Sequence, residues 1–417
     1  MTTLQNVKQS DKLVNSPFPI ATALRLLWSV FVPQPDFNLK GCKSEARKVI
    51  EADFDGFDVI SVVHSLEENQ RSSTRDSELE SFQKNVTGRF EDLSRASDAE
   101  LLSIDWMRKL LDAFICCHEE FRVILLNNKE QISNSPLDRS ISEFFERLVK
   151  ALDICNASRD GIEKIRLWLK HLEIVLHALG SNKRALSEGQ VLRARKALMD
   201  LALAMLDEKD CRSVFPQRNR SFGQHNSSKD HRRHLTEHSR SHSWSVSRSW
   251  SAAKQLHSIA SNLVPPRGSE IVATIGLAVP VYTMNSVLLF VLWALVAAIP
   301  CQDRGLNIQL SVPRQFSWST PVTLLHERIK KRERRTSNGL LKEINQVESC
   351  VRHMGDLVDS VQFPLTDEQK MEAEQKVKEL SVVCGALRDG LDPLERQVRE
   401  MFRKIMTCRA EGLDYLG

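Results

Sequence analysis

Apolar residues recur every three or four positions along most of the chain from Ser77 onward, which is the spacing of one helix face. The pattern predicts successive helices over 79–93, 100–124, 136–152, 162–179 and 187–205. Gly180 is a helix stop signal, and Ser187 is a start signal. Four or five antiparallel helices with short connections should therefore form an N-terminal bundle over 77–211.

Residues 1–76 show no such periodicity and are predicted to be an N-terminal extension. The segment from Ile20 to Val32 is apolar, but Arg25 interrupts it and prolines lie on both sides. No stretch of small residues suited to cleavage follows it, so a flexible extension is favoured over a cleaved signal peptide.

A second apolar segment covers residues 268–302. No charged residue occurs from Ile271 to Gln302, and residues 281–300 taken as a helix span roughly 30 Å, enough to cross the core of a bilayer. A helix that is hydrophobic all round is also typical of the centre of a bundle. The sequence leaves both interpretations open, a membrane-spanning helix or a buried core helix.

Residues 303–417 return to helical periodicity. Thr320-Pro321 begins one helix, and Leu340, Ile344, Val347, Val351, Met354, Val358 and Val361 form the seam of another. That seam packs on another helix either of this chain or of a partner. Thr366 with Gln369 should begin a further helix, and Asp392-Pro393 should begin the last one. The fold class predicted is all-α, a multi-helix bundle with one long apolar helix and a disordered basic linker.

The distribution of charge along the sequence predicts the basic linker. The formal net charge is +4, yet residues 212–267 contain ten Lys or Arg residues against two acidic ones. Serine occupies every second position from Ser239 to Ser251, so an extended chain would place the intervening cations and indoles on the opposite side. A second basic cluster covers 328–335. The candidate contacts to a membrane or a partner are Arg240, Trp244, Arg248, Trp250, Lys330, Lys331 and Arg332.

Three interpretations of the linker remain: a solvated connection without a partner, a contact to an anionic membrane or protein surface, and stacking on single-stranded nucleic acid. We expect no nucleic-acid partner. The predicted location is at a membrane, with a cytosolic pool. The nine scattered cysteines are typical of reduced thiols in a cytosol-facing protein.

No pattern of catalytic chemistry is present. His118-Glu119 and His326-Glu327 lack a second histidine one turn later, so they are not zinc protease motifs. The sequence has no glycine-rich phosphate loop and no CxxC pair, and Cys116-Cys117 is expected to be a buried structural pair. The histidines of the linker are expected to be solvated. We therefore predict no enzyme activity, no cofactor and no metal.

Four stretches together resemble one plant family, the BYPASS and ROH proteins, with the ROH branch closer. They are 82–93, 101–121, 247–254 and 277–318, and the resemblance covers about 77–417. It implies a non-enzymatic protein that binds the Exo-seventy-type subunit of the exocyst and modulates polarised secretion, such as the deposition of seed-coat mucilage and wall material. The BYPASS branch implies instead a membrane protein of developmental signalling that controls a root-derived mobile signal.

Overall fold

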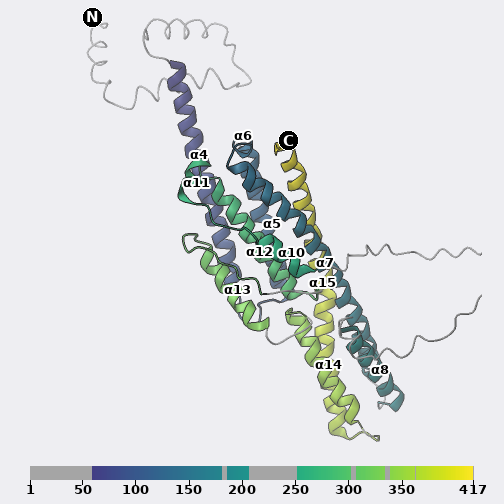
Figure 1. Ribbon diagram of the computed structural model, residues 1–417. Helices are drawn as coiled ribbons and strands as arrows, with labels where there is room; N and C mark the ends of the chain where they lie inside the picture. The colour runs from purple at the N-terminus through teal and green to yellow at the C-terminus, as the bar shows by residue number, and fades with distance from the viewer. Residues whose placement is uncertain are drawn as a thin grey trace, which may run out of the picture. The chain divides into compact units, whose positions relative to one another are not determined.

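The computed structural model describes residues 59–180, 186–205, 251–301, 307–333, 339–361 and 363–416 (Figure 1). All regular structure in these ranges is helical, which confirms the all-α prediction. The chain divides into two compact units, residues 1–74 and 75–417. In the first unit only the beginning of α4 is described, and the second contains the remaining helices.

The helices differ in length and in role. They are α4 (Val59–Ser94), α5 (Ile104–Asn127), α6 (Lys129–Ile132), α7 (Leu137–Leu179), α8 (Glu188–Met205), α10 (Ala252–Ala260), α11 (Gly268–Ala273), α12 (Ala278–Ala298), α13 (Ser319–Glu333), α14 (Lys342–Ser360) and α15 (Asp367–Leu416). Helix α4 therefore begins well before Ser77, where the sequence pattern becomes regular.

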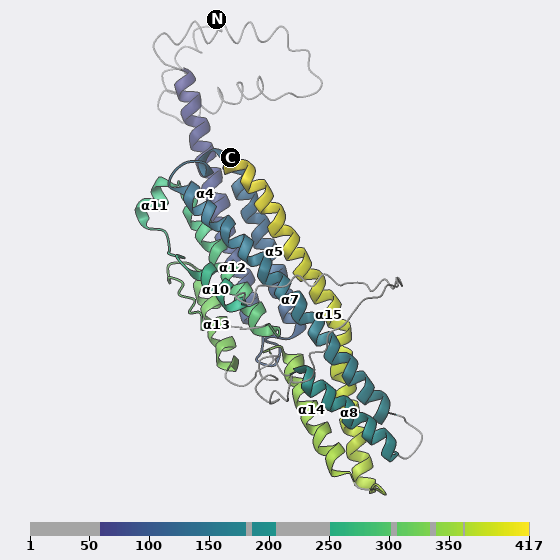
Figure 2. The ribbon, with the colours of Figure 1, turned by 45° about the vertical axis from the view of Figure 1, so that its right-hand side comes forward.

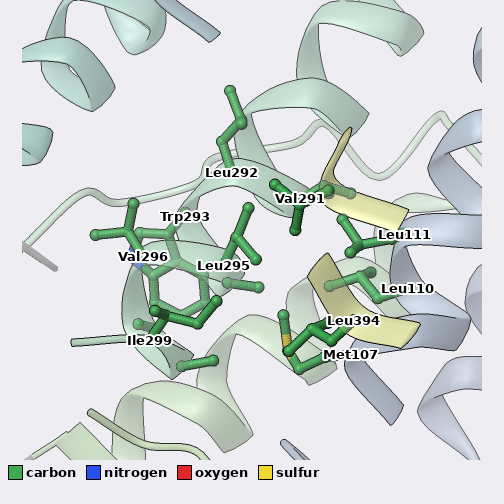
Figure 3. Packing of buried hydrophobic residues seen from close by; sticks show 14 of the residues in the cluster. Met107, Leu110, Leu111, Val291, Leu292, Trp293, Leu295, Val296, Ile299 and Leu394 are labelled. Atoms are coloured by element: carbon green, nitrogen blue, oxygen red, sulfur yellow. The ribbon is translucent and has the colours of Figure 1, made fainter. Parts of the chain in front are cut away.

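Helix α12 lies at the centre of the second unit. It packs against α5, α7, α10 and α13, and each of its residues except Val279 is buried. Figure 3 shows Val291 of α12 beside Leu111 of α5, in a cluster that also includes Leu394 of α15. The apolar helix predicted from the sequence is thus enclosed by other helices of the same chain. It is also the helix whose length and composition suit a membrane span.

The C-terminal end of α12 is closed by the segment that leads into α14. The amides of Leu340 and Leu341 donate to the carbonyls of Ala297 and Ala298 at 2.9 and 3.1 Å. These carbonyls have no acceptor role inside α12, so the bonds complete its last turn. Gly339 makes the approach possible: its φ is +125°, and a Cβ there would lie 2.6 Å from the Ala298 carbonyl oxygen.

Helix α7 is one continuous helix, whereas the sequence pattern predicted two helices separated near Gly161. The glycine serves close packing. A Cβ on Gly161 would collide with the side chain of Ile299 and lie 2.9 Å from the carbonyl oxygen of Pro300, because the end of α12 crosses α7 at this point. Ser158 and Ile162 are buried on the same side, so the packing face runs through the predicted break.

Helix α15 also corrects a predicted boundary, since Pro393 lies inside it and does not begin a new helix. A buried row continues across the proline at helical spacing through Leu387, Leu391, Leu394 and Val398. Two ion pairs from Arg166 of α7, to Asp392 at 2.6 Å and Glu395 at 2.7 Å, hold the same turn. The packing outweighs the single backbone hydrogen bond that proline removes.

The second half of α7 joins α8, α14 and α15 in a four-helix arrangement, and both ribbon views show these helices side by side (Figure 2). Ile344, Val347, Met354 and Val358 of the predicted seam are buried, and α14 contacts α15 and α8. The seam thus packs within the chain. Thr366 and Gln369 exchange the two hydrogen bonds of a capping box at the start of α15, as predicted.

Residues 251–267 were assigned to the basic linker, but the structure places their first part in the folded unit as α10. The Ser251 hydroxyl accepts a bond from the Lys254 amide at 3.2 Å, and Leu256 is buried. Buried Arg147 of α7 donates to the carbonyls of Ile259 and Ser261 at 3.1 and 3.2 Å. These bonds fasten α10 to the core, and residues 206–250 lie outside the described ranges.

We predict that Gly161→Ala lowers the free energy of unfolding by about 1–3 kcal/mol, because the added methyl group enters a contact that cannot open without shifting backbone. The measurement is urea denaturation followed by circular dichroism. Gly355→Ala is the matched control, since a Cβ there meets nothing within 4 Å and alanine favours the helix by up to about 1 kcal/mol. Equal midpoints for wild type and Gly161→Ala would contradict the packing role.

Candidate functional site

The candidate contact residues fall into two groups. Arg240, Trp244, Arg248 and Trp250 lie outside the described residues. Lys330, Lys331 and Arg332 lie in the last turns of α13, where the structure divides the basic run between two faces. Lys330 and Lys331 are exposed, whereas Arg328 and Arg332 turn toward the loop that joins α4 to α5.

This division follows from the spacing along α13. Leu325 and Ile329 are four residues apart and define its buried face. Arg328 and Arg332 lie three residues after them, so they border the same face. The intervening lysines point away. This spacing is visible in the sequence, but a count of charges alone assigns residues 328–335 to one basic surface.

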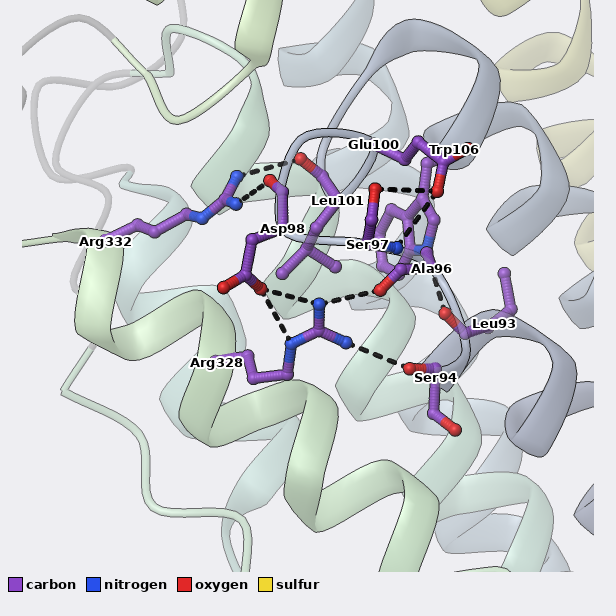
Figure 4. A network of polar contacts seen from close by, with 10 residues as sticks. All are labelled: Leu93, Ser94, Ala96, Ser97, Asp98, Glu100, Leu101, Trp106, Arg328 and Arg332. Atoms are coloured by element: carbon purple, nitrogen blue, oxygen red, sulfur yellow. Dashed lines mark hydrogen bonds and ion pairs between the residues drawn. The ribbon is translucent and has the colours of Figure 1, made fainter.

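Arg328 closes the C-terminal end of α4. Its guanidinium donates to the carbonyls of Ser94 at 2.9 Å and Ala96 at 2.7 Å, and to the carboxylate of Asp98 at 2.6 Å (Figure 4). The carbonyls at a helix end need such partners. The bond from Arg328 holds the pKa of Asp98 below its usual value, so this carboxylate stays ionised.

Arg332 holds the next part of the same loop. It donates to the carbonyl of Leu101 at 2.9 Å and to the carbonyl of Asp98 (Figure 4). Arg332 is therefore engaged within the chain, while the two exposed lysines remain accessible. Among the residues predicted to contact a membrane or partner, the described ones thus divide into one structural arginine and two surface lysines.

The loop itself is more ordered than the sequence indicates. Ser97 and Glu100 are hydrogen-bonded to each other at 2.9 and 3.0 Å, but α5 begins only at Ile104, four residues after the start of the helix predicted over 100–124. Ser103 is the N-cap instead, its hydroxyl accepting from the Trp106 amide at 3.2 Å. Leu102 before it has a φ of +61°, a conformation that sequence signals do not reveal for a leucine.

Helix α13 also covers α12. His326 is buried, its ring lies 4.3 Å from that of Trp293 between centroids, and its Nε2 donates to the Ile308 carbonyl at 3.1 Å. Burial lowers the pKa of His326, so the imidazole is neutral. The His326-Glu327 pair noted in the sequence thus has a packing role, in which the two members diverge because Glu327 is exposed.

In the second His-Glu pair, His118-Glu119, the histidine also packs in the interior. His118 is fully buried, neither ring nitrogen has a hydrogen-bond partner among the described residues, and burial lowers its pKa to about 4.

Burial raises the pKa of the Cys117 thiol to about 12. Cys116 is exposed, which corrects the expectation of a buried pair. Within the described ranges, no three His, Cys, Asp or Glu residues cluster as metal ligands would.

Comparison with known proteins identifies relatives over the same residues. The family model described as Protein ROH1-like matches residues 52–416. Protein ROH1D of Arabidopsis thaliana is 53% identical over 371 residues, covering 86% of this chain and 93% of the relative. Protein ROH1A of Arabidopsis thaliana is 36% identical over 377 residues, covering 81% and 90%.

A more distant relative is UPF0496 protein 4 of Oryza sativa subsp. japonica. It is 22% identical over 269 residues, covering 64% of this chain and 50% of the relative. No solved structure matches the chain.

For the basic end of α13, we predict that Arg328→Met lowers the free energy of unfolding by about 1–3 kcal/mol, because two helix-end carbonyls lose their donor. Lys330→Met removes a charge of the same sign from the exposed face and should change it by less than about 0.5 kcal/mol. Thermal and urea denaturation of both variants measure the difference. If the two variants lose equal stability, the structural role of Arg328 is wrong.

Proposed function

This chain belongs to the ROH1-like family, and we propose that it is a non-enzymatic regulator of polarised exocytosis that binds the Exo-seventy-type subunit of the exocyst. The observation that carries the proposal is the extent of the match, residues 52–416, which includes every helix of the second unit. The resemblance to the ROH branch seen in the sequence is thereby confirmed. The exocyst partner is what that resemblance implies.

The arrangement of the described residues supports a binding role. Burial lowers the pKa of His118 and raises the pKa values of Cys117 and Cys155, so these three core groups are uncharged near neutral pH. Such groups stabilise packing and do not exchange protons near neutral pH. The polar side chains that remain accessible lie on the outer faces of long helices, where they suit contact with another macromolecule.

The experiment that tests the proposal is direct binding of the purified full-length chain to the purified Exo-seventy-type subunit, measured by isothermal titration calorimetry and by co-elution in gel filtration. We expect a saturable complex. A different exocyst subunit, which should not bind, controls for nonspecific association. Heat signals and elution profiles equal to those of this control would refute the proposal.

One observation favours a second function, that of a single-pass membrane protein of developmental signalling, because α12 has the length and composition of a membrane span. Several contacts argue against it. Helices α5, α7, α10 and α13 cover α12, and the amides of Leu340 and Leu341 bond its final carbonyls. Insertion into lipid would strip these partners and expose the apolar faces that now enclose it. We therefore propose that α12 is a core helix.

Carbonate extraction of membranes from cells that express the chain separates the two functions. We predict that alkaline carbonate releases the protein into the supernatant, because a core helix has no lipid contacts to retain it. A marker with an established single span must remain in the pellet of the same sample. Retention of this chain with that marker would favour the membrane-spanning alternative.

A further inference from the structure

Helix α10 is attached to the second unit by few side chains. It has nine residues, and those that are buried are Ala252, Leu256 and Ile259. The remaining residues of α10 are exposed or half-buried. Helix α12, by contrast, is buried along almost its whole length. A helix as short as α10 is only marginally stable in water on its own, so it keeps its form chiefly because it is docked.

The chain downstream of α10 adds little to this attachment. Pro266 is the one buried residue between Ser261 and Arg267, and α11 buries none of its residues. Upstream, residues 206–250 join α8 to α10, and a chain of that length allows α10 to move without pulling on α8. The contacts of α10 itself therefore decide whether it stays in place.

Helices α7 and α12 form the surface on which α10 lies, and both ribbon views show the three helices together (Figure 2). Arg147 of α7 donates to the Ile259 carbonyl at 3.1 Å, and the Gln255 side chain donates to Asp153 of α7 at 3.3 Å. The later residue of α7 thus meets the earlier residue of α10, so the two helices run in opposite directions. We call the surface that α10 covers on α7 and α12 the α10 site.

Part of the α10 site keeps its arrangement without α10. The Arg147 guanidinium also donates to the side-chain oxygen of Asn285 of α12 at 3.4 Å and to Glu143 of its own helix at 3.5 Å. Neither partner belongs to α10, so both remain to orient Arg147 when α10 leaves. The site therefore retains a prearranged donor for the carbonyls at the end of a helix.

We propose that α10 is a detachable helix that blocks a binding site of its own chain. It leaves the α10 site while the other helices of the second unit stay folded. The open site then binds an amphipathic helix of a partner. Such a helix has a small residue, a leucine and an isoleucine at the spacing of Ala252, Leu256 and Ile259, and its last carbonyls accept from Arg147.

The first test is whether substitutions in α10 add. Leu256→Asp should detach α10, after which Ile259→Asp has no further contact to disrupt. We therefore expect the full-length double variant to melt within about 2 °C of Leu256→Asp alone, because two substitutions that remove the same docked helix are not additive. Circular dichroism at increasing temperature measures both variants.

Leu288→Asp in α12 is the matched control, since Leu288 is also fully buried. It should abolish the cooperative transition, because α12 cannot bring the new carboxylate to water without unfolding the unit. Loss of the transition in Leu256→Asp as well would show that α10 is an integral part of the core. A second decrease in the double variant, as large as the first, would equally overturn the proposal.

The second test fills the open site from outside with a fluorescein-labelled peptide of residues 251–263. Fluorescence anisotropy should show saturable binding to full-length Leu256→Asp at peptide concentrations up to about 1 mM. The wild type should bind at least about tenfold more weakly, because its own α10 occupies the site at high effective concentration. The same peptide with Leu256→Asp is the control and should bind neither chain.

Two results of the peptide titration contradict a detachable α10. One is the absence of binding to Leu256→Asp, which would mean that the site does not persist without α10. The other is equal binding to Leu256→Asp and to the wild type, which would place the peptide elsewhere on the chain. No exocyst subunit enters either experiment, so the results do not depend on the proposed function.

Discussion

The burial of α12 is the constraint on which the rest of the second unit depends. A helix that is apolar on every side has no face to present to water, so other helices must surround it. Helices α5, α7, α10 and α13 do so, although they come from both ends of the sequence. Removing a large side chain from such a core costs roughly 2–5 kcal/mol, so small defects in this enclosure weaken the whole unit. The N-terminal and C-terminal helices are thus parts of one core.

Enclosing a helix on all sides also requires that the ends of its neighbours be satisfied, and buried or half-buried polar side chains do this at three places. Arg147 bonds carbonyls at the C-terminal end of α10, Arg328 bonds carbonyls at the C-terminal end of α4, and Glu343 accepts from the Ile104 amide at the start of α5. Burial raises the pKa of Glu343, since its carboxylate is removed from water. Each group is bonded because an unpaired buried charge would be far more costly than the hydrogen bonds are worth. They fix which neighbour lies where, which apolar contacts alone do not.

Periodicity was enough to predict most of the helices, and the local start signal at Thr366 was correct. Two of the wrong boundaries were at Gly161 and Pro393. Both residues usually end helices, but here packing across α7, α12 and α15 overrides the local preference. The roles of Arg328 and Arg332 were missed because their partners are carbonyls more than 200 residues away. The burial of α12 is produced by the other helices, so the sequence of that segment alone could not predict it.

Helix α8 is apolar on two sides, and the core of the second unit uses one of them. Surface leucines and methionines occur singly on most soluble proteins and need no explanation. On α8, exposed Leu192, Met199 and Leu203 lie in register on one side of the helix. The core of this unit is completed without them, since α8 already buries Val191, Leu198 and Leu201. The outer side chains are therefore not part of that core.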